Sequence, residues 1–273
     1  MRCSRSTSRS PRRVLITGAT GGLGAAFAAA LPPAADLLLA ARDEHRLQTA
    51  AQKLVTNDRV VETLSADLSS SEEVAAVVER AEAFGIDLLI NNAGVGTLGR
   101  VIDNPVEAER ATVAVNVAAV VQLTRGLVPG MLRRAREDGR RAGLITVSST
   151  AAFVPVPTFA TYAATKAFEL HFTEALAEEL LGDPIDILCL CPGAVRTGFG
   201  ERAGYRGGAL PGAADPKGVA RQALAALGRR RVLVTGTVGR AAFGPWLRPR
   251  RAVTGAIGAA LGGLTRRMAT ERP

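Results

Sequence analysis

Tyr162 and Lys166, four positions apart, are the residues of this chain best suited to proton chemistry. They lie in a stretch with helical spacing, so both side chains leave the same face of the helix about one turn apart. A free tyrosine has a pKa of about 10 and exchanges protons poorly at neutral pH. A nearby ammonium favours the phenolate and lowers that pKa, which would make the pair an acid and base catalyst. The same spacing also occurs by chance in many helices.

A glycine-rich segment near the N-terminus is the second candidate. Gly18, Gly22 and Gly24 follow an expected strand at 14–17 and open an expected helix at 23–31. Glycines at this point let backbone N–H groups approach a pyrophosphate, which the helix N-terminus then attracts. The segment favours dinucleotide binding, with a plain tight turn as the alternative.

Arg42 ends the second expected strand, eighteen residues after Gly24. An Asp or Glu here would bind the ribose hydroxyls of NAD, whereas a guanidinium can hold the additional phosphate of NADP. Arg42 therefore favours NADP(H), with NAD still possible. The alternative is a solvated arginine at the end of a strand.

These residues are carried by short apolar runs that alternate with longer helical stretches, the pattern of βαβ units around a parallel sheet. The expected strands are 14–17, 37–41, 60–65, 88–91, 144–148, 185–191 and 232–235. The expected helices are 23–31, 44–54, 71–84, 106–135, 158–181 and 216–227, with Ser71 and Asp215 as N-terminal caps of two of them. The sequence predicts an α/β fold: a single domain with a Rossmann-type, doubly wound parallel sheet of seven strands and helices on both faces.

In such a sheet the carboxyl ends of the strands share one edge, where ligands bind. Asn91 to Gly94 follows the fourth expected strand, and Ser148 and Ser149 close the fifth. We therefore expect these polar groups to gather at one crevice, although they are far apart in the sequence.

Six segments in this order resemble the short-chain dehydrogenase/reductase family, from about residue 12 to 235. They are Gly18-x-x-x-Gly22-x-Gly24, Asn91-Asn92-Ala93-Gly94, Asn116, Ser149, Tyr162-x-x-x-Lys166 and Cys191-Pro192-Gly193-Ala194-Val195-Arg196-Thr197. The resemblance implies an NADP(H)-dependent oxidoreductase that interconverts a carbonyl and a secondary alcohol by hydride transfer. The alternative is an NAD(P)-binding sensor or scaffold without turnover.

The resemblance also implies a role for each matching position. Tyr162 would exchange the proton, and Ser149 would polarise the substrate oxygen. Lys166 would hold the nicotinamide ribose and lower the pKa of Tyr162, while Asn116 would anchor a water that relays protons. Cofactor contacts would come from Gly18, Thr20, Gly22, Leu23, Gly24, Arg42, Asp67, Leu68, Asn92, Ala93, Gly94, Tyr162, Lys166, Pro192, Gly193, Val195 and Thr197. For Asp67, a turn with the serines that follow is nearly as good an interpretation as an adenine contact.

The substrate is less well defined. The segment 151–157 is almost wholly apolar and favours a lipophilic ketone or a 3-oxoacyl-type substrate, with contact to a neighbouring subunit as the alternative. We expect 193–215 to form a long mobile loop. Its Arg196, Arg202 and Arg206 would meet an anionic carrier or remain solvated.

The net charge of +9 is concentrated at the two ends of the chain, so the centre is mildly acidic. This favours a disordered basic tail at 1–11, a catalytic domain at 12–239 and a basic Gly/Ala/Arg-rich extension at 240–273. Such tails do not indicate specific nucleic-acid binding. The extension could make weak peripheral membrane contact, although its glycines oppose a helix. No apolar run reaches the length of about 18 residues that a membrane span needs.

The cysteines and histidines do not suggest a metal site, because the chain has three Cys, two His and no CxxC pair. Cys189 and Cys191 should lie on one face of a strand as small core residues. Reduced thiols fit a cytoplasmic protein. The family resemblance implies a homodimer or homotetramer.

Overall fold

The computed structural model describes residues 11–205, 212–247 and 249–258. Residues 1–10 of the predicted tail, Arg206 and residues 259–273 of the predicted extension lie outside this range.

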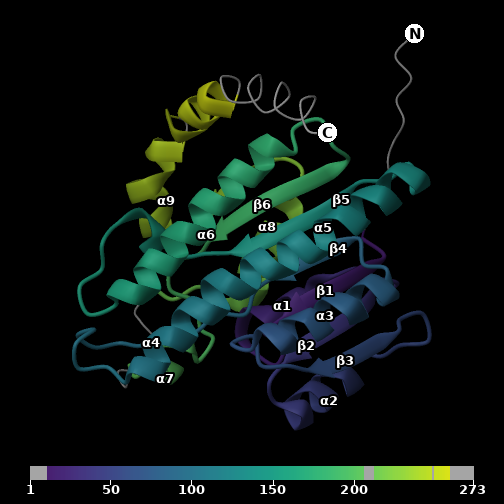
Figure 1. Ribbon diagram of the computed structural model, residues 1–273, viewed down its shortest axis with the longest axis horizontal. Coiled ribbons are helices and arrows are strands. Elements are labelled where there is room, and N and C mark those ends of the chain that lie inside the picture. Colours follow the sequence, from purple (N-terminus) through teal and green to yellow (C-terminus); the bar gives the residue numbers. More distant parts are fainter. Residues whose placement is uncertain (1–10, 206–211, 248, 259–273) are drawn as a thin grey trace, which may run out of the picture.

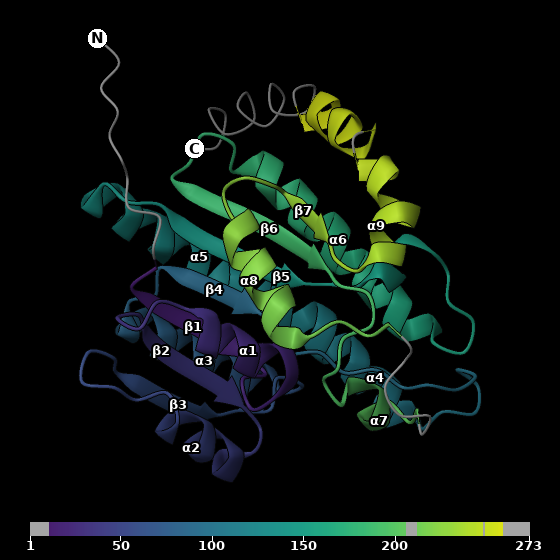
Figure 2. The same cartoon turned by 180° about the vertical axis from the view of Figure 1, so that it is seen from behind.

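Seven parallel strands form one sheet in the order β3-β2-β1-β4-β5-β6-β7 (Figures 1 and 2). They are β1 Arg13–Thr17, β2 Asp36–Ala41, β3 Val61–Ser65, β4 Leu88–Asn91, β5 Ala142–Val147, β6 Ile185–Cys191 and β7 Val232–Val234. The chain changes direction across the sheet between β1 and β4, which places a crevice beyond the ends of these neighbouring strands. The predicted fold is confirmed, and every expected strand is present within two residues of its predicted ends.

Helices cover both faces of the sheet. They are α1 Gly22–Ala30, α2 Glu44–Gln52, α3 Ser71–Phe84, α4 Val106–Val113, α5 Ala119–Asp138, α6 Ala160–Glu179, α7 Phe199–Arg202, α8 Pro216–Ala226 and α9 Thr237–Phe243. α3, α5 and α6 pack on the face seen in Figure 1 around one apolar cluster. α1, α2 and α8 pack on the opposite face, seen in Figure 2, around a second cluster.

The helix caps show how local chemistry sets the boundaries. Asp215 accepts a hydrogen bond from the backbone N–H of Gly218 at 3.0 Å and caps α8 as predicted. The prediction for α3 is wrong by one residue, because Ser70 is the cap. Its hydroxyl accepts from the N–H of Glu73 at 3.3 Å, and Ser71 is the first residue inside the helix.

The expected helix at 106–135 is not regular throughout. A π-helical turn, η1 Ala114–Ala118, separates α4 from α5. Among the described residues, Val106–Asp138 is the one helical run long and apolar enough to cross a membrane, and half of its most apolar window is buried in the fold. Contacts with α3, β4 and β5 account for that burial and make α5 a core helix.

The chain continues after β7 as helices that pack on the domain. The predicted boundary at 239 and 240 falls inside α9, and residues 249–258 are helical in spite of Gly255 and Gly258. Phe243 stacks on Phe153 with ring centroids 4.9 Å apart. Arg250 forms an ion pair with Glu174 of α6. These tertiary contacts offset the low helix propensity of glycine.

Two glycines, each the third residue of its helix, give a matched test of how tightly α1 meets the sheet. A Cβ on Gly24 would lie 2.3 Å from the Gly18 carbonyl oxygen, whereas one on Gly218 would lie 3.8 Å from its nearest neighbour, Asp215. We expect Gly24→Ala to lower the free energy of unfolding by about 1 to 3 kcal/mol. We expect Gly218→Ala to raise it by about 0.4 to 1 kcal/mol. Urea denaturation of both variants measures the difference, and equal effects would contradict the close approach.

Candidate active site

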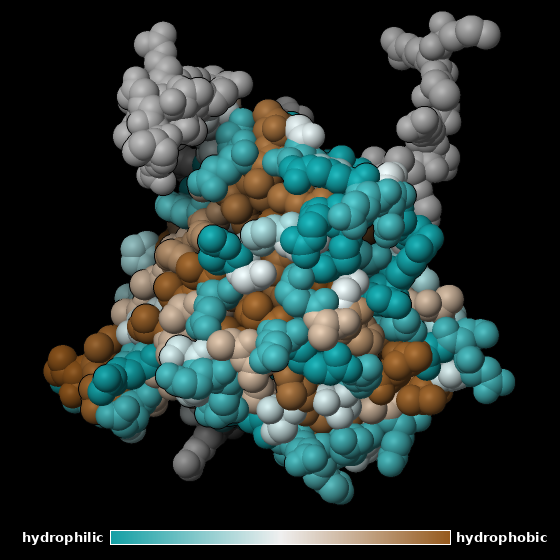
Figure 3. Space-filling model, turned by 45° about the vertical axis from the view of Figure 1, so that its right-hand side comes forward, coloured by the Kyte–Doolittle hydropathy of each residue, from teal (hydrophilic) through white to brown (hydrophobic). Residues whose placement is uncertain are grey.

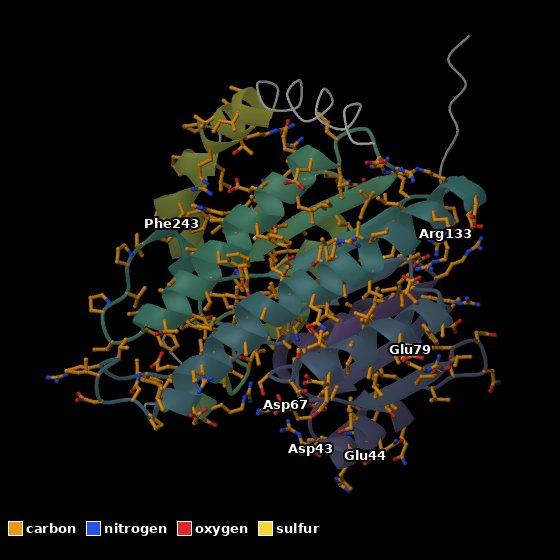
Figure 4. The ribbon with its side chains drawn as sticks, in the orientation of Figure 1. Asp43, Glu44, Asp67, Glu79, Arg133 and Phe243 are labelled. Atoms are coloured by element: carbon orange, nitrogen blue, oxygen red, sulfur yellow. The ribbon has the colours of Figure 1, made fainter. Side chains whose placement is uncertain are left out.

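A cavity of about 910 Å³ runs along the carboxyl edge of the sheet. Asp43 and Asp67 lie at one end and Phe243 lies at the other (Figure 4). All the site residues predicted from the sequence line this cavity, except for Gly24 and Asn116. The shared strand edge therefore brings together segments that are up to about 180 residues apart in the chain.

The glycine-rich loop after β1 lies closely against the segment after β4. Gly18 has a φ of +66°, and a Cβ at this position would lie 2.9 Å from the Cα of Ala93. The Asn92 side-chain amide donates to the carbonyls of Thr17 and Gly18, at 2.8 and 3.2 Å. Asn92 thus anchors the glycine-rich loop to the segment after β4. The N-cap of α1 is Gly21, which has no side chain, and the first turn contains no acidic residue.

This loop fits the diphosphate of a dinucleotide. The start of α1 faces the cavity with no carboxylate or side-chain cap competing for its N–H groups. From the other side, the loop after β6 contributes Thr197, whose Cβ would lie 2.7 Å from a Cβ on Gly22. The residues present therefore leave room for a diphosphate but not for larger side chains in the loop.

Three arginines surround the end of the cavity next to β2. Arg42 and Arg46 line it from the β2 side, and Arg202 lines it from α7 across the cavity. The pKa of Arg202 is lowered by burial and then by the positive charges of Arg46 and Arg42. Arg42 and Arg46 are therefore both close enough to repel Arg202, and an anion at this end of the cavity would relieve that repulsion.

Asp67 forms the turn considered for it and also lies at the cavity. Its carboxylate accepts from the N–H and the hydroxyl of Ser69, at 3.0 and 2.9 Å, so it does form a turn. The backbone hydrogen bond from Ser69 is the main cause that lowers the pKa of Asp67. Asp67 also lines the cavity beside Leu68, where an adenine contact was expected.

Tyr162 lies on α6 and is 9% exposed. Its ring stacks on Phe159 at a centroid distance of 4.3 Å and lies 5.2 Å from the ring of Phe199. The pKa of Tyr162 is raised from its ordinary value, contrary to the lowering expected from the sequence, because burial outweighs the charge of Lys166 and a hydrogen bond with the Ser149 side chain, which lower it. The serine at the end of β5 and the tyrosine of α6 are therefore in contact.

Lys166 is almost completely buried one turn after Tyr162. Its Nζ lies 5.6 Å from the centre of the Tyr162 ring. The ammonium donates to both carboxylate oxygens of Glu169, at 2.8 and 2.9 Å, and to the Val147 carbonyl at 3.0 Å. The charge of Lys166 is thus close enough to act on the phenol of Tyr162.

Asn116 is completely buried in the π-helical turn η1. Its side chain accepts from the N–H of Val95 at 3.0 Å and donates to the carbonyl of Val95 at 2.8 Å. It also donates to the Thr165 hydroxyl at 3.0 Å. Asn116 therefore joins the segment after β4 to α6, and a π-turn at this point is typical of functional sites.

The part of the cavity near Tyr162 is apolar. It is lined by Leu98, Ala151, Val154, Val156, Phe159, Phe199 and Phe243. Of the loop arginines, Arg196 donates to the carbonyl of Ala213 at 2.7 Å and so stabilises the loop itself. Arg202 lies at the opposite, cationic end, which leaves no described arginine of this loop beside the apolar wall.

Sequence reasoning missed four residues that shape the site. Glu169 lies three positions after Lys166 on the same helix, so helical spacing could have indicated it. Arg46 lies in the first turn of α2, close to Arg42 in the sequence, which is a weaker signal. Gly96 is needed because a Cβ there would lie 2.7 Å from the Tyr162 ring. Phe243 lines the cavity from α9, and no local sequence pattern predicts such a contact. Among the described residues no group of three or more Cys, His, Asp or Glu is placed to hold a metal.

Comparison with known proteins agrees with this geometry. The profile of the short chain dehydrogenase family matches residues 12–205. Dehydrogenase/reductase SDR family member 7B of Xenopus laevis is 33% identical over 245 residues, which cover 82% of this chain and 74% of that protein.

Two solved structures have the same fold. A short-chain dehydrogenase from Sphingobium yanoikuyae in complex with NADPH has a TM-score of 0.74 and 30% identity, with 96% of each chain covered. A 3-ketoacyl-(acyl-carrier-protein) reductase from Brucella melitensis complexed with NADH has a TM-score of 0.71 and 28% identity. That match covers 84% of this chain and 98% of the other.

Replacing Asn116 tests its role as a link. In Asn116→Ala the N–H and carbonyl of Val95 lose their partners, and each buried group left unpaired costs about 1 to 3 kcal/mol. We expect a drop of that size in the free energy of unfolding, measured by urea denaturation. The control is Gln48→Ala, whose side chain makes one exposed hydrogen bond, to the Thr63 hydroxyl at 3.0 Å, with an expected loss of about 1 kcal/mol or less. Equal losses in both variants would contradict the assignment.

Proposed function

The chain belongs to the short-chain dehydrogenase/reductase family, whose members use NAD(P) to interconvert CH–OH and C=O groups, and on that premise we propose that it is an NADPH-preferring reductase of a lipophilic ketone or 3-oxoacyl-type substrate. One observation carries the proposal: a single cavity joins a rim of three arginines to an apolar wall around Tyr162. The first end suits a phosphate, and the second suits an apolar substrate with one polar group.

The side chains around Tyr162 suit carbonyl reduction. When bound, the reduced nicotinamide supplies the hydride. The Ser149 hydroxyl is placed to donate to the substrate oxygen and to polarise the carbonyl. Tyr162 then gives its phenolic proton to that oxygen, and the Lys166 ammonium stabilises the phenolate that remains. Asn116 holds the segment that faces them.

The preference for NADPH is supported by charge. The phosphate that distinguishes NADP from NAD carries about two negative charges, and arginine binds such groups with paired hydrogen bonds. Arg42 and Arg46 are both close enough to repel Arg202, and no acidic residue takes the position of Arg42 after β2. The next residue, Asp43, accepts from the N–H of Arg46 at 2.9 Å and so caps α2.

We also propose a cytoplasmic homodimer or homotetramer. The thiols of Cys189 and Cys191 are free and buried with sulfur atoms 3.8 Å apart, which is compatible with a reducing compartment. Val113 on α4 and Val121 on α5 are 46% and 37% exposed and could form a subunit contact. On the face drawn in Figure 3, apolar and hydrophilic residues are interspersed. Weak membrane contact of the basic C-terminal extension remains part of this proposal.

Substitution of the arginines tests the cofactor preference. We expect Arg42→Gln and Arg46→Gln each to raise the dissociation constant of NADPH about tenfold or more, because a charge-assisted bond is worth about 1.5 to 3 kcal/mol. The constant for NADH should stay nearly unchanged. Fluorescence titration measures both constants, with Arg110→Gln on exposed α4 as the control. An equal loss for the two cofactors would contradict phosphate recognition.

Replacing Tyr162 tests turnover and separates the enzyme from the sensor. We expect Tyr162→Phe to lower kcat for carbonyl reduction by about 10² to 10⁴, because the proton donor is lost while the ring still stacks on Phe159. NADPH binding should persist. The assay measures the consumption of NADPH, and in parallel that of NADH, with a panel of aliphatic, aromatic and 3-oxoacyl carbonyls. If the unmodified protein binds NADPH but reduces none of them, the sensor alternative is favoured.

A further inference from the structure

Glu169 is a buried carboxylate that the proposed mechanism does not use. It lies one turn after Lys166 on α6, and the two side chains are only 1% and 4% exposed. Both of its oxygens are within 2.9 Å of the Lys166 ammonium. An acidic residue enclosed at this depth is rare unless its partner requires it.

The bonds of Lys166 show how closely the two groups are coupled. An ammonium has three N–H donors, and here it has three acceptors: the two Glu169 oxygens and the Val147 carbonyl. Its donors are therefore satisfied within the protein. The ammonium nitrogen is thus closer to the negative charge of Glu169 than to the Tyr162 ring, whose centre lies 5.6 Å from it.

We propose that Glu169 is a positioning residue that holds Lys166 and offsets its charge, so that Tyr162 keeps its proton over a wider pH range and the site favours carbonyl reduction. This inference rests on the proposed function in one respect, since it needs Tyr162 to be the proton donor. Its electrostatic part concerns the ligand-free protein alone.

The directions of the pKa shifts agree with this arrangement. The pKa of Tyr162 is raised by burial, lowered by Lys166 and raised by Glu169, so the carboxylate opposes the lysine. Burial raises the pKa of Glu169 to about 7, against the lowering effect of Lys166. Glu169 is therefore fully charged above that pH, in the range where Tyr162 titrates.

A further titratable group acts on this pair, the Cys189 thiol of β6. Burial raises the pKa of Cys189 well above its usual value, so that this thiol stays neutral. Glu174, also on α6, is 8% exposed and forms an ion pair with Arg250. Among the described residues, Glu169 is the carboxylate bonded to Lys166. Glu174 is thus a matched control, because it is also buried, paired and on α6.

The composition of the chain allows Tyr162 to be observed directly. There are only two tyrosines, Tyr162 and Tyr205. In a Tyr205→Phe background the ultraviolet absorbance of tyrosinate reports Tyr162 alone. The ligand-free protein is titrated from neutral to alkaline pH in this background, with and without Glu169→Gln or Glu174→Gln. Circular dichroism at each pH limits the data to folded protein.

We expect Glu169→Gln to lower the titration midpoint of Tyr162 by less than the about 1 to 3 pH units that a directly adjacent charge produces, because Glu169 is the smallest of the effects on that pKa. Glu174→Gln should leave the midpoint in place. Glu169→Asp, which moves the carboxylate back by one methylene, should lower it by a smaller amount and provides the test if the Gln variant does not fold. An unchanged or raised midpoint, or an equal shift in Glu174→Gln, would overturn the proposal.

The pH profile of NADPH-dependent reduction gives the second readout. Reduction needs protonated Tyr162, so activity falls as pH rises through its pKa. We expect Glu169→Gln to move this alkaline limb to lower pH by the same amount as the tyrosinate midpoint. A limb that stays in place while the midpoint moves would refute the link to reduction. If the midpoint moves but the protein reduces no carbonyl, the proposed function fails while the electrostatic role of Glu169 stands.

Discussion

A buried ammonium group determines how the site is arranged. Removing the charge of Lys166 from water is costly unless it is both paired and fully hydrogen-bonded. Glu169 supplies the opposite charge from the same helix, and the carbonyl of Val147 supplies the third acceptor from β5. The hydrogen bond to the Val147 carbonyl fixes the position of α6 along β5. Tyr162, one turn earlier, is thereby placed beside Ser149 at the end of the same strand.

The segment after β4 is shaped to fit around these two side chains. A Cβ on Gly94 would lie 3.3 Å from the Lys166 ammonium, and one on Gly96 would lie 2.7 Å from the Tyr162 ring. Asn116 holds this segment through both backbone groups of Val95. The glycines therefore create the space, and the asparagine keeps the backbone from closing it. The π-turn in the helix is the local irregularity that accompanies this contact.

The sequence predicted well what depends on local pattern and on the topology of a parallel sheet. The seven strands, the cap at Asp215 and the gathering of Ser149, Tyr162 and Asn92 at one edge follow from these alone. It did not predict contacts between elements that carry no local signal. The π-turn depends on how Asn116 meets Val95 and Thr165, and Phe243 reaches the cavity because α9 packs on the end of β7. The spacing of Glu169 from Lys166 is visible in the sequence, but only the structure shows that both side chains are buried together.

The loop after β6 connects the two ends of the cavity. Within six residues, Thr197 lies against the glycine loop, Phe199 contacts the Tyr162 ring and Arg202 reaches the arginines after β2. A shift of this loop would therefore change the surroundings of the phosphate and of the phenol together. Its position is fixed at its base by backbone bonds between Ala194, Arg196 and Ala214, while Arg202 lies among like charges. An anion bound at the arginines would relieve that repulsion on the same short segment that contacts Tyr162 through Phe199.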